Sequence, residues 1–145
     1  MTSGMNPFKK FWKSPDPPTD LHPVRVEALV VEDQKDEAEM LCGLLRLQNV
    51  LVTWSGNMAG TLQCLDRSTR FQLAFIDLGL PNGSGIEIVR KIKEGRRMTH
   101  VIVVSGAIEK IPLVLSYGYV GILGKPYSVS AIREILWKHR LPFAD

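Results

Sequence analysis

The chain has 145 residues, of which 45% are hydrophobic, and this size and composition are typical of one globular domain with a full hydrophobic core. The net charge of +3 is too small to indicate nucleic-acid binding by itself, and no apolar run approaches the roughly 20 residues that span a bilayer. Cys42 and Cys64 lie inside helical patterns without a CxxC spacing, so we expect two free thiols in a cytoplasmic protein rather than a disulfide or a zinc site.

Residues 1–23 differ in composition from the rest of the chain. They hold five of its nine prolines, and proline-rich polar segments stay extended or flexible. Within them, Phe8–Lys13 interleaves aromatic residues with lysines, which suits either a weak docking element for an anionic surface or partner, or a mobile tail. We expect a flexible basic tail over residues 1–23, one domain over residues 24–141 and a short C-terminal tail over residues 142–145.

Strand-like and helix-like patterns alternate five times in the remaining chain. In chain order they are a strand at Val26–Val31, a helix at Gln34–Gln48, a strand at Leu51–Trp54, a helix at Met58–Leu65, a strand at Leu73–Asp77, a helix at Ser84–Glu94, a strand at His100–Ser105, a helix at Ile108–Tyr117, a strand at Val120–Leu123 and a last helix capped by Ser128 or Ser130. The strands are almost continuously apolar, which is typical of strands covered on both faces. The pattern predicts a doubly wound α/β fold with a parallel sheet and helices on both faces.

Two details of the helices are predicted as well. The first helix has an apolar stripe made of Ala38, Leu41, Cys42, Leu44, Leu45 and Leu47. The fourth helix is weak, because Pro112 lies inside it and proline breaks the turn before it. The aromatic residues Trp54 and Trp137 are expected to pack against the core, whereas His22, His100 and His139 are scattered and are expected to be structural or solvated.

Polar residues stand at the ends of four of the five predicted strands. Glu32 and Asp33 follow the first strand, Asp77 ends the third, Ser105 ends the fourth and Lys125 follows the fifth. Because the carboxyl ends of parallel strands share one edge of the sheet, we expect these side chains to lie together. Each residue alone is typical of a solvated strand end, but their agreement predicts a functional site.

The residue types at this edge favour phosphoryl chemistry. Three neighbouring carboxylates repel one another, and Lys125 supplies only one compensating charge. Mg²⁺ supplies more, because it binds oxygen ligands and keeps several waters. Asp77 would then be the nucleophile that forms an aspartyl phosphate, while Lys125 pairs with one phosphoryl oxygen and Ser105 donates a hydrogen bond to another.

Four motifs together resemble the receiver domain of bacterial response regulators in two-component signalling, of the chemotaxis-regulator type. They are Val-Val-Glu-Asp at 30–33, Asp-Leu-Gly-Leu-Pro-Asn-Gly-Ser-Gly at 77–85, Val-Ser-Gly at 104–106 and Gly-Lys-Pro-Tyr at 124–127. The resemblance covers Val24 to about Leu141. It implies a flavodoxin-like, five-stranded parallel sheet with the strand order 2-1-3-4-5.

The resemblance also assigns roles to the strand-end residues. It implies that Asp77 accepts a phosphoryl group from a histidine kinase or a phosphotransfer protein, and that Ser105 is the switch hydroxyl. Mg²⁺ would be held by Glu32, Asp33, Asp77 and the backbone carbonyl of Gly79, with Glu32 acting directly or through water. The Lys125–Pro126 peptide bond is expected to be cis. Such a protein phosphorylates itself from a phosphodonor and is not a turnover enzyme.

The sequence departs from the receiver pattern on the face that normally carries the output. Receivers usually place Phe or Tyr three residues before the lysine, where this chain has Ile122, and Tyr119 precedes the strand and does not replace it. We therefore expect this face to be remodelled for a different partner, or only weakly coupled to phosphorylation. Gly79 and Ala107 stand where receivers tune the lifetime of the phosphoryl group, and neither side chain can hold an attacking water, so slow dephosphorylation is expected.

The leading interpretation is a stand-alone receiver that signals by docking onto a downstream target protein. A homodimer is possible, and we expect no direct binding to nucleic acid and no membrane span. A second interpretation is a pseudo-receiver, an interaction module with weak or no phosphorylation-coupled switching. A third, an aspartyl phosphatase of the haloacid dehalogenase type, would carry a second Asp two residues after the nucleophile, where this chain has Gly79.

Overall fold

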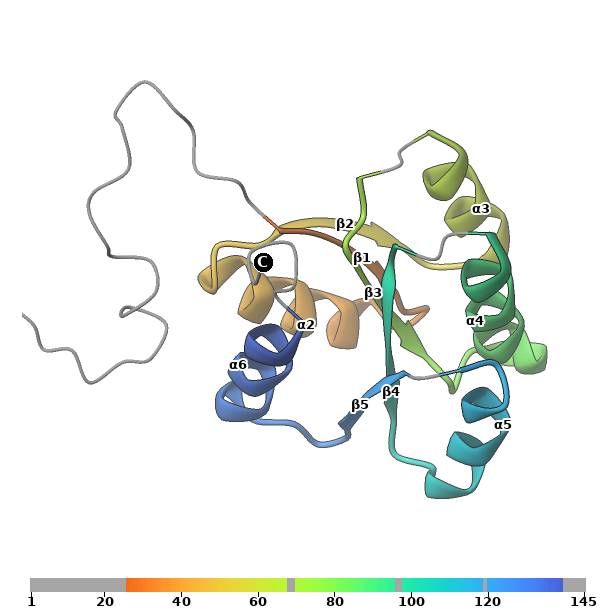
Figure 1. Cartoon of the computed structure of the whole chain (residues 1–145). Coiled ribbons are helices and arrows are strands. Elements are labelled where there is room, and N and C mark those ends of the chain that lie inside the picture. The colour runs from red at the N-terminus through yellow and green to blue at the C-terminus, as the bar shows by residue number, and fades with distance from the viewer. Residues whose placement is uncertain (1–25, 68–69, 96–97, 119, 140–145) are drawn as a thin grey trace, which may run out of the picture.

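The computed structural model describes residues 26–67, 70–95, 98–118 and 120–139, and helices cover both faces of its single five-stranded sheet (Figure 1). The strands are β1 (Glu27–Val31), β2 (Leu51–Ser55), β3 (Leu73–Asp77), β4 (His100–Ser105) and β5 (Gly121–Gly124). The helices are α2 (Lys35–Leu47), α3 (Met58–Arg67), α4 (Ser84–Gly95), α5 (Ile111–Leu115) and α6 (Val129–Lys138), with short 3₁₀ turns at Pro81–Gly83 and Ile108–Lys110. None of the described helices has the length and apolar content needed to cross a membrane. The predicted tails, His22 and Tyr119 lie outside the described residues.

The sheet has the strand order β2-β1-β3-β4-β5 with every neighbouring pair parallel, which confirms the predicted fold. The register aligns the carboxyl ends of the strands: Val31 pairs with Ile76, Asp77 with Val104 and Ser105 with Gly124. The residues that follow β1, β3, β4 and β5 therefore emerge at one edge of the sheet.

Two apolar layers hold the sheet between its helices. Alternate residues of each strand point to opposite faces, so Leu29 and Val31 of β1 pack under α3, α4 and α5, while Ala28 and Val30 pack under α2 and α6. All five residues of β3 are buried, since this strand is central and has helices on both sides. Burial on both faces explains the nearly continuous apolar character of the strands in the sequence.

The predicted apolar stripe of α2 is correct except at its end. Ala38, Leu41, Cys42 and Leu45 are buried, but Leu47 is 79% exposed. Leu47 lies two positions after Leu45, which rotates its side chain by about 200° around the helix axis and away from the sheet. Both cysteines are free thiols, as expected, with Cys42 buried and Cys64 partly buried.

The predicted weakness of the helix around Pro112 is confirmed, since the α-helix is only five residues long, but Pro112 lies at its start and not in its interior. The segment after β4 forms the 3₁₀ turn and then α5, and Pro112 lies in the first turn of α5. A proline is tolerated there because the first backbone N–H groups of a helix have no intrahelical partner. Pro112 thus begins a short helix instead of interrupting a longer one, and α5 ends at Leu115.

Candidate functional site

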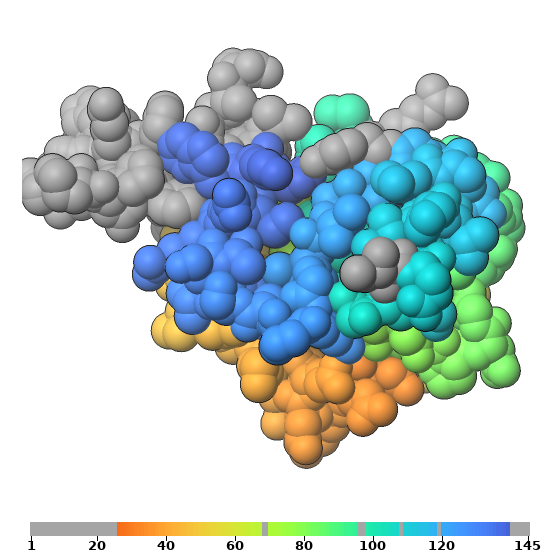
Figure 2. All heavy atoms as spheres, turned by 90° about the horizontal axis from the view of Figure 1, so that it is seen from below, coloured from red at the N-terminus to blue at the C-terminus, as the bar shows by residue number. Residues whose placement is uncertain are grey.

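The strand ends form one face of the molecule, which Figure 2 shows from below. There the start of α2 (orange), the β3–α4 region (green), the segment after β4 (cyan) and the segment after β5 (blue) meet around the carboxyl edge of the sheet. A pocket of about 280 Å³ opens at this edge. It is lined by Asp33, Gln34, Glu37, Asp77, Gly79, Ser105, Gly106, Ala107 and Lys125.

The three acidic residues that the sequence places at this edge do lie together. One carboxylate oxygen each from Glu32, Asp33 and Asp77 lies within 4.8 Å of the others. Glu32 and Asp77 are buried, with 4% and 5% of their surface exposed, whereas Asp33 is exposed. Burial of Glu32 raises its pKa to about 7, and the nearby charge of Asp77 adds to this, although the backbone N–H of Gln34 acts in the opposite direction.

This cluster suits a hard divalent cation. All three ligands are carboxylate oxygens, the donor type that Mg²⁺ and Ca²⁺ prefer, and the described residues add no histidine or cysteine to it. Burial is the main cause of the raised pKa of Glu32, and the negative charge of Asp77 adds to it, so the Glu32 carboxylate is poorly compensated. A bound cation would remove that imbalance, so the residues present fit the metal that the resemblance implies.

Asp77 is held firmly at the end of β3. Its Oδ1 accepts a hydrogen bond from the backbone N–H of Gly79 at 2.9 Å, and the N–H of Leu78 donates to the carbonyl of Val104 at 3.0 Å. The first turn of α4 closes tightly over this strand end: a Cβ on Gly85 would lie 2.4 Å from the carbonyl oxygen of Asp77 and 3.1 Å from Cα of Leu78. Only glycine permits this approach, so Gly85 determines how near α4 begins to Asp77.

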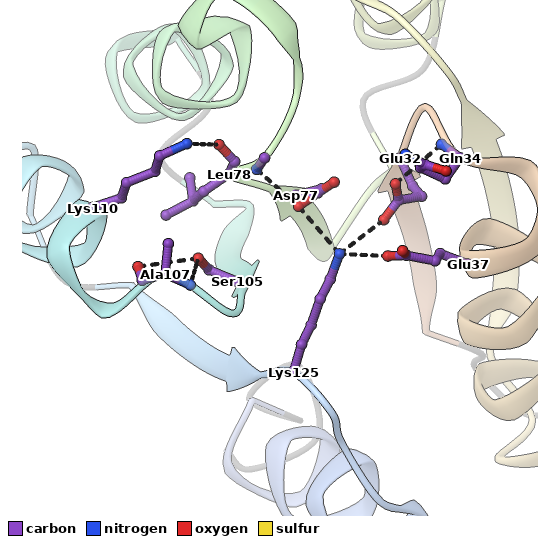
Figure 3. Close-up of polar contacts among 10 residues, drawn as sticks. Glu32, Gln34, Glu37, Asp77, Leu78, Ser105, Ala107, Lys110 and Lys125 are labelled. Carbon is purple, nitrogen blue, oxygen red and sulfur yellow. Dashed lines mark hydrogen bonds and ion pairs between the residues drawn. The ribbon is translucent and has the colours of Figure 1, made fainter.

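Lys125 reaches across the pocket from the end of β5 and meets three carboxylates (Figure 3). Its Nζ lies 2.5 Å from Oε1 of Glu37, 3.5 Å from Oδ1 of Asp77 and 3.6 Å from Oε1 of Glu32. Burial acts to lower the pKa of Lys125, but the hydrogen bond with Glu37 and the three negative charges outweigh it and raise the pKa. The Lys125–Pro126 peptide bond is cis, as expected.

Ser105 lines the pocket on the side opposite the acidic cluster and currently bonds within its own loop. Its Oγ accepts a hydrogen bond from the N–H of Ala107 at 2.9 Å and donates one to the carbonyl of Ala107 at 3.2 Å. Further along the same segment, Nζ of Lys110 donates to the carbonyl of Leu78 at 3.3 Å (Figure 3). The loop after β4 is thereby connected to the loop after β3.

Sequence reasoning missed Glu37 and Lys110. Glu37 lies in the first turn of α2, the helix that directly follows the acidic end of β1, and this position is the signal that could have indicated its proximity to the pocket. Lys110 gave no such signal, because its contact with Leu78 depends on the 3₁₀ turn that precedes α5.

Trp54 was expected only to pack, and this is wrong in part. Its ring is 43% exposed because β2 is an edge strand, and its Nε1 donates to the backbone carbonyl of Glu32 at 2.8 Å. The predicted scatter of the histidines also fails for one pair: the rings of His100 and His139 lie 5.4 Å apart, at the opposite edge of the sheet from the pocket. Ile122 is 42% exposed on β5.

Comparisons with known proteins agree with this arrangement. The response regulator protein PilR of Pseudomonas aeruginosa is 28% identical over 114 residues, which cover 77% of this chain and 25% of PilR. The sensor histidine kinase AruS of the same organism is 30% identical over 117 residues, which cover 77% of this chain and 12% of AruS. The chain thus spans a quarter or less of the length of these two curated relatives.

Solved structures share the fold. A response regulator from Thermotoga maritima is 21% identical, with a TM-score of 0.71 over 80% of this chain and 98% of that one. A CheY-like receiver domain protein from Methanospirillum hungatei is 22% identical, with a TM-score of 0.71 over 83% of this chain and 95% of that one. A family model for the response regulator receiver domain matches residues 28–136, which is most of the chain. This chain belongs to the response regulator receiver domain family.

Proposed function

We propose that Asp77 accepts a phosphoryl group from a histidine kinase or a phosphotransfer protein, in a reaction that requires Mg²⁺. The observation that supports this most strongly is the position of Asp77. Its buried carboxylate lies in one cluster with those of Glu32 and Asp33, and Nζ of Lys125 is 3.5 Å away. A receiver domain is a signalling domain, so the chain carries the phosphoryl group on its own side chain instead of turning over a substrate. The cytoplasmic location stays a prediction.

Glu32, Asp33, Asp77 and the carbonyl of Gly79 are the residues that would hold the metal ion. When bound, Mg²⁺ neutralises charge on the transferred group and on the acids around it. The chain contributes the ligand geometry, because β1 and β3 end side by side in the sheet and bring Glu32 and Asp77 to the same edge.

In the transfer step, a carboxylate oxygen of Asp77 attacks the phosphorus atom, the bond from phosphorus to the donor breaks, and its electron pair leaves with the donor. Oδ1 accepts a hydrogen bond from the backbone N–H of Gly79 and lies 3.5 Å from Nζ of Lys125. Lys125 pairs with a phosphoryl oxygen, and the Ser105 hydroxyl exchanges its bond to the Ala107 carbonyl for a second phosphoryl oxygen. This exchange would move the loop that follows β4.

The output of the switch is proposed to be docking onto a downstream protein. One observation favours a second candidate, an interaction module with weak switching: Ile122 occupies the position of the usual aromatic residue and is 42% exposed on β5. The two candidates differ in the segment 106–118. Amide chemical shifts there change on phosphorylation if the switch is coupled, and stay the same in the second candidate.

The direct test is the intact mass of the chain after incubation with Mg²⁺ and acetyl phosphate. We expect one phosphoryl group on the parent chain and none on Asp77→Asn. Asp66→Asn is the matched control, because Asp66 is an exposed residue of α3 outside the pocket, and it should be modified like the parent. Equal modification of Asp77→Asn and the parent, or none of the parent in the presence of Mg²⁺, would contradict the proposal.

A further inference from the structure

The ammonium group of Lys125 makes its closest carboxylate contact away from Asp77. Oε1 of Glu37 lies 2.5 Å from Nζ, whereas the nearest oxygens of Asp77 and Glu32 are 3.5 and 3.6 Å away. Figure 3 shows Glu37 reaching in from α2 on the far side of Lys125 from Ser105. The lysine that should meet the phosphoryl group is therefore held most strongly by a residue of the helix beside the pocket.

Glu37 differs from the other two acids that Lys125 contacts. Glu32 and Asp77 belong to the cluster whose oxygens lie within 4.8 Å of one another, and Glu37 does not. A cation bound to that cluster would compete with Lys125 for Glu32 and Asp77 but would leave its contact with Glu37 intact. The contact between Lys125 and Glu37 is thus the one that a bound cation leaves in place, and it draws the ammonium group away from Asp77.

Glu37 can influence the position of Lys125 although its own side chain is neither buried nor needed for the fold. Its side chain is 47% exposed and lines the mouth of the pocket, where Lys125 is 27% exposed. Partly exposed ion pairs of this kind are weak, because water screens the two charges. Such a contact can bias where the lysine rests and can still be displaced by a doubly charged phosphoryl group.

We propose that Glu37 is a positioning residue that holds Lys125 away from the phosphoryl position and so slows phosphorylation of Asp77. This inference rests on the proposed function, since it concerns the rate of the same transfer. Removing the negative charge of Glu37 leaves Lys125 with Asp77 and Glu32 as its remaining acidic contacts, which brings the ammonium group to where the incoming phosphoryl oxygen needs it. Phosphorylation by a small donor should then become faster.

The test compares Glu37→Gln with Glu39→Gln in rates of phosphorylation by acetyl phosphate at saturating Mg²⁺. Glu39 is the matched control, because it is an exposed glutamate of the same helix that pairs with Lys35 and does not line the pocket. We expect Glu37→Gln to be about two- to fivefold faster than the parent, since the lost contact is a partly exposed ion pair. Glu39→Gln should stay within about 1.5-fold of the parent, the size expected for a distant exposed charge.

A second pair of variants separates positioning from simple charge repulsion between Glu37 and the anionic donor. If Glu37 acts through Lys125, then Glu37→Gln has no effect on the rate when Lys125→Met is already present, because the two residues are coupled. An equal acceleration in the Lys125→Met protein would overturn the inference and assign the effect to charge alone. The half-saturating Mg²⁺ concentration should change less than about twofold in Glu37→Gln, since Glu37 lies outside the acidic cluster.

The remaining outcomes are distinct. If the parent gains a phosphoryl group and Glu37→Gln gains it at the same rate, the inference fails and the proposed function stands. If the parent gains none, the proposed function fails and this inference fails with it. Equal thermal midpoints of the parent, Glu37→Gln and Glu39→Gln would exclude a folding effect as the cause of any difference in rate.

Discussion

At the scale of single residues, Trp54 connects the acidic cluster to an observable signal. Its Nε1 donates to the carbonyl of Glu32, the residue whose side chain belongs to the cluster, and its ring is partly open to solvent. A cation bound to the cluster would change the charge beside the Trp54 indole, and indole fluorescence responds to nearby charge. The signal is therefore expected from Trp54, whose indole donates directly to the backbone of the cluster residue Glu32.

We predict that Mg²⁺ changes the tryptophan fluorescence of the chain in a saturable way, and that Trp54→Phe removes most of this change. Asp33→Asn should raise the half-saturating Mg²⁺ concentration by about tenfold or more, since a carboxylate ligand is lost. Asp66→Asn should leave the titration unchanged. A full response in Trp54→Phe, or an unchanged midpoint in Asp33→Asn, would show that the cation binds elsewhere.

At the scale of secondary-structure elements, the start of α4 packs directly against the strand end that carries Asp77. Gly85 brings this helix against the carbonyl oxygen of Asp77, where an added Cβ would lie 2.4 Å away. The atoms that Cβ would meet belong to the backbone of Asp77 and Leu78, so no side chain can rotate to make room. The helix or the strand end would have to move.

We predict that Gly85→Ala lowers the free energy of unfolding by about 1–3 kcal/mol, the usual cost of forcing extra volume into a packed site. Urea unfolding measures this change, and the same variant should bind Mg²⁺ more weakly because Asp77 is displaced. Gly43→Ala is the matched control: Gly43 lies inside α2 with nothing within 4 Å of an added Cβ. That variant should be more stable by up to about 1 kcal/mol. If Gly85→Ala and Gly43→Ala changed the free energy of unfolding in the same direction, the steric explanation would be contradicted.

At the scale of the whole molecule, the sequence predicts the features that follow from the alternation of strands and helices. It does not predict contacts that depend on the angles at which helices pack on the sheet. Asp77, Ser105 and Lys125 were placed at one edge because parallel strands align their carboxyl ends, and the register gives that result directly. The approach of His139 to His100 could not be predicted, since it requires the angle at which α6 crosses the sheet. The contact of Glu37 with Lys125 likewise requires the position of α2 and a particular side-chain conformation.

The two edges of the sheet carry groups whose titrations affect stability in opposite directions. His139, 4% exposed at the end of α6, has its pKa lowered to about 4 by burial first, and then by the charges of His100, Lys138 and Lys93. Unfolding restores an ordinary pKa near 6.5 and takes up a proton, so His139 stabilises the fold above that pH and loses this contribution as the pH falls toward about 4. Glu32, with its pKa raised to about 7, has the reverse effect: protonation below that pH favours the folded state.

We therefore predict that the effect of His139 on the pH dependence of stability becomes measurable once Glu32 is replaced by a residue that does not titrate. In Glu32→Gln, the free energy of unfolding should fall between about pH 6.5 and pH 4, because His139 is protonated only after unfolding in that range. Adding His139→Gln should flatten this fall by up to about 3 kcal/mol, since each unit of pKa difference corresponds to about 1.4 kcal/mol. Urea unfolding at several pH values in this range measures the slope of the free energy of unfolding against pH. A packing defect at position 139 would lower the free energy equally at every pH and would not alter this slope. Identical slopes with and without His139 would mean that the pKa of His139 is the same in the folded and unfolded chain. The close packing of His139 against Gly121 argues against that result, because a Cβ added to Gly121 would lie 2.9 Å from Nε2 of His139.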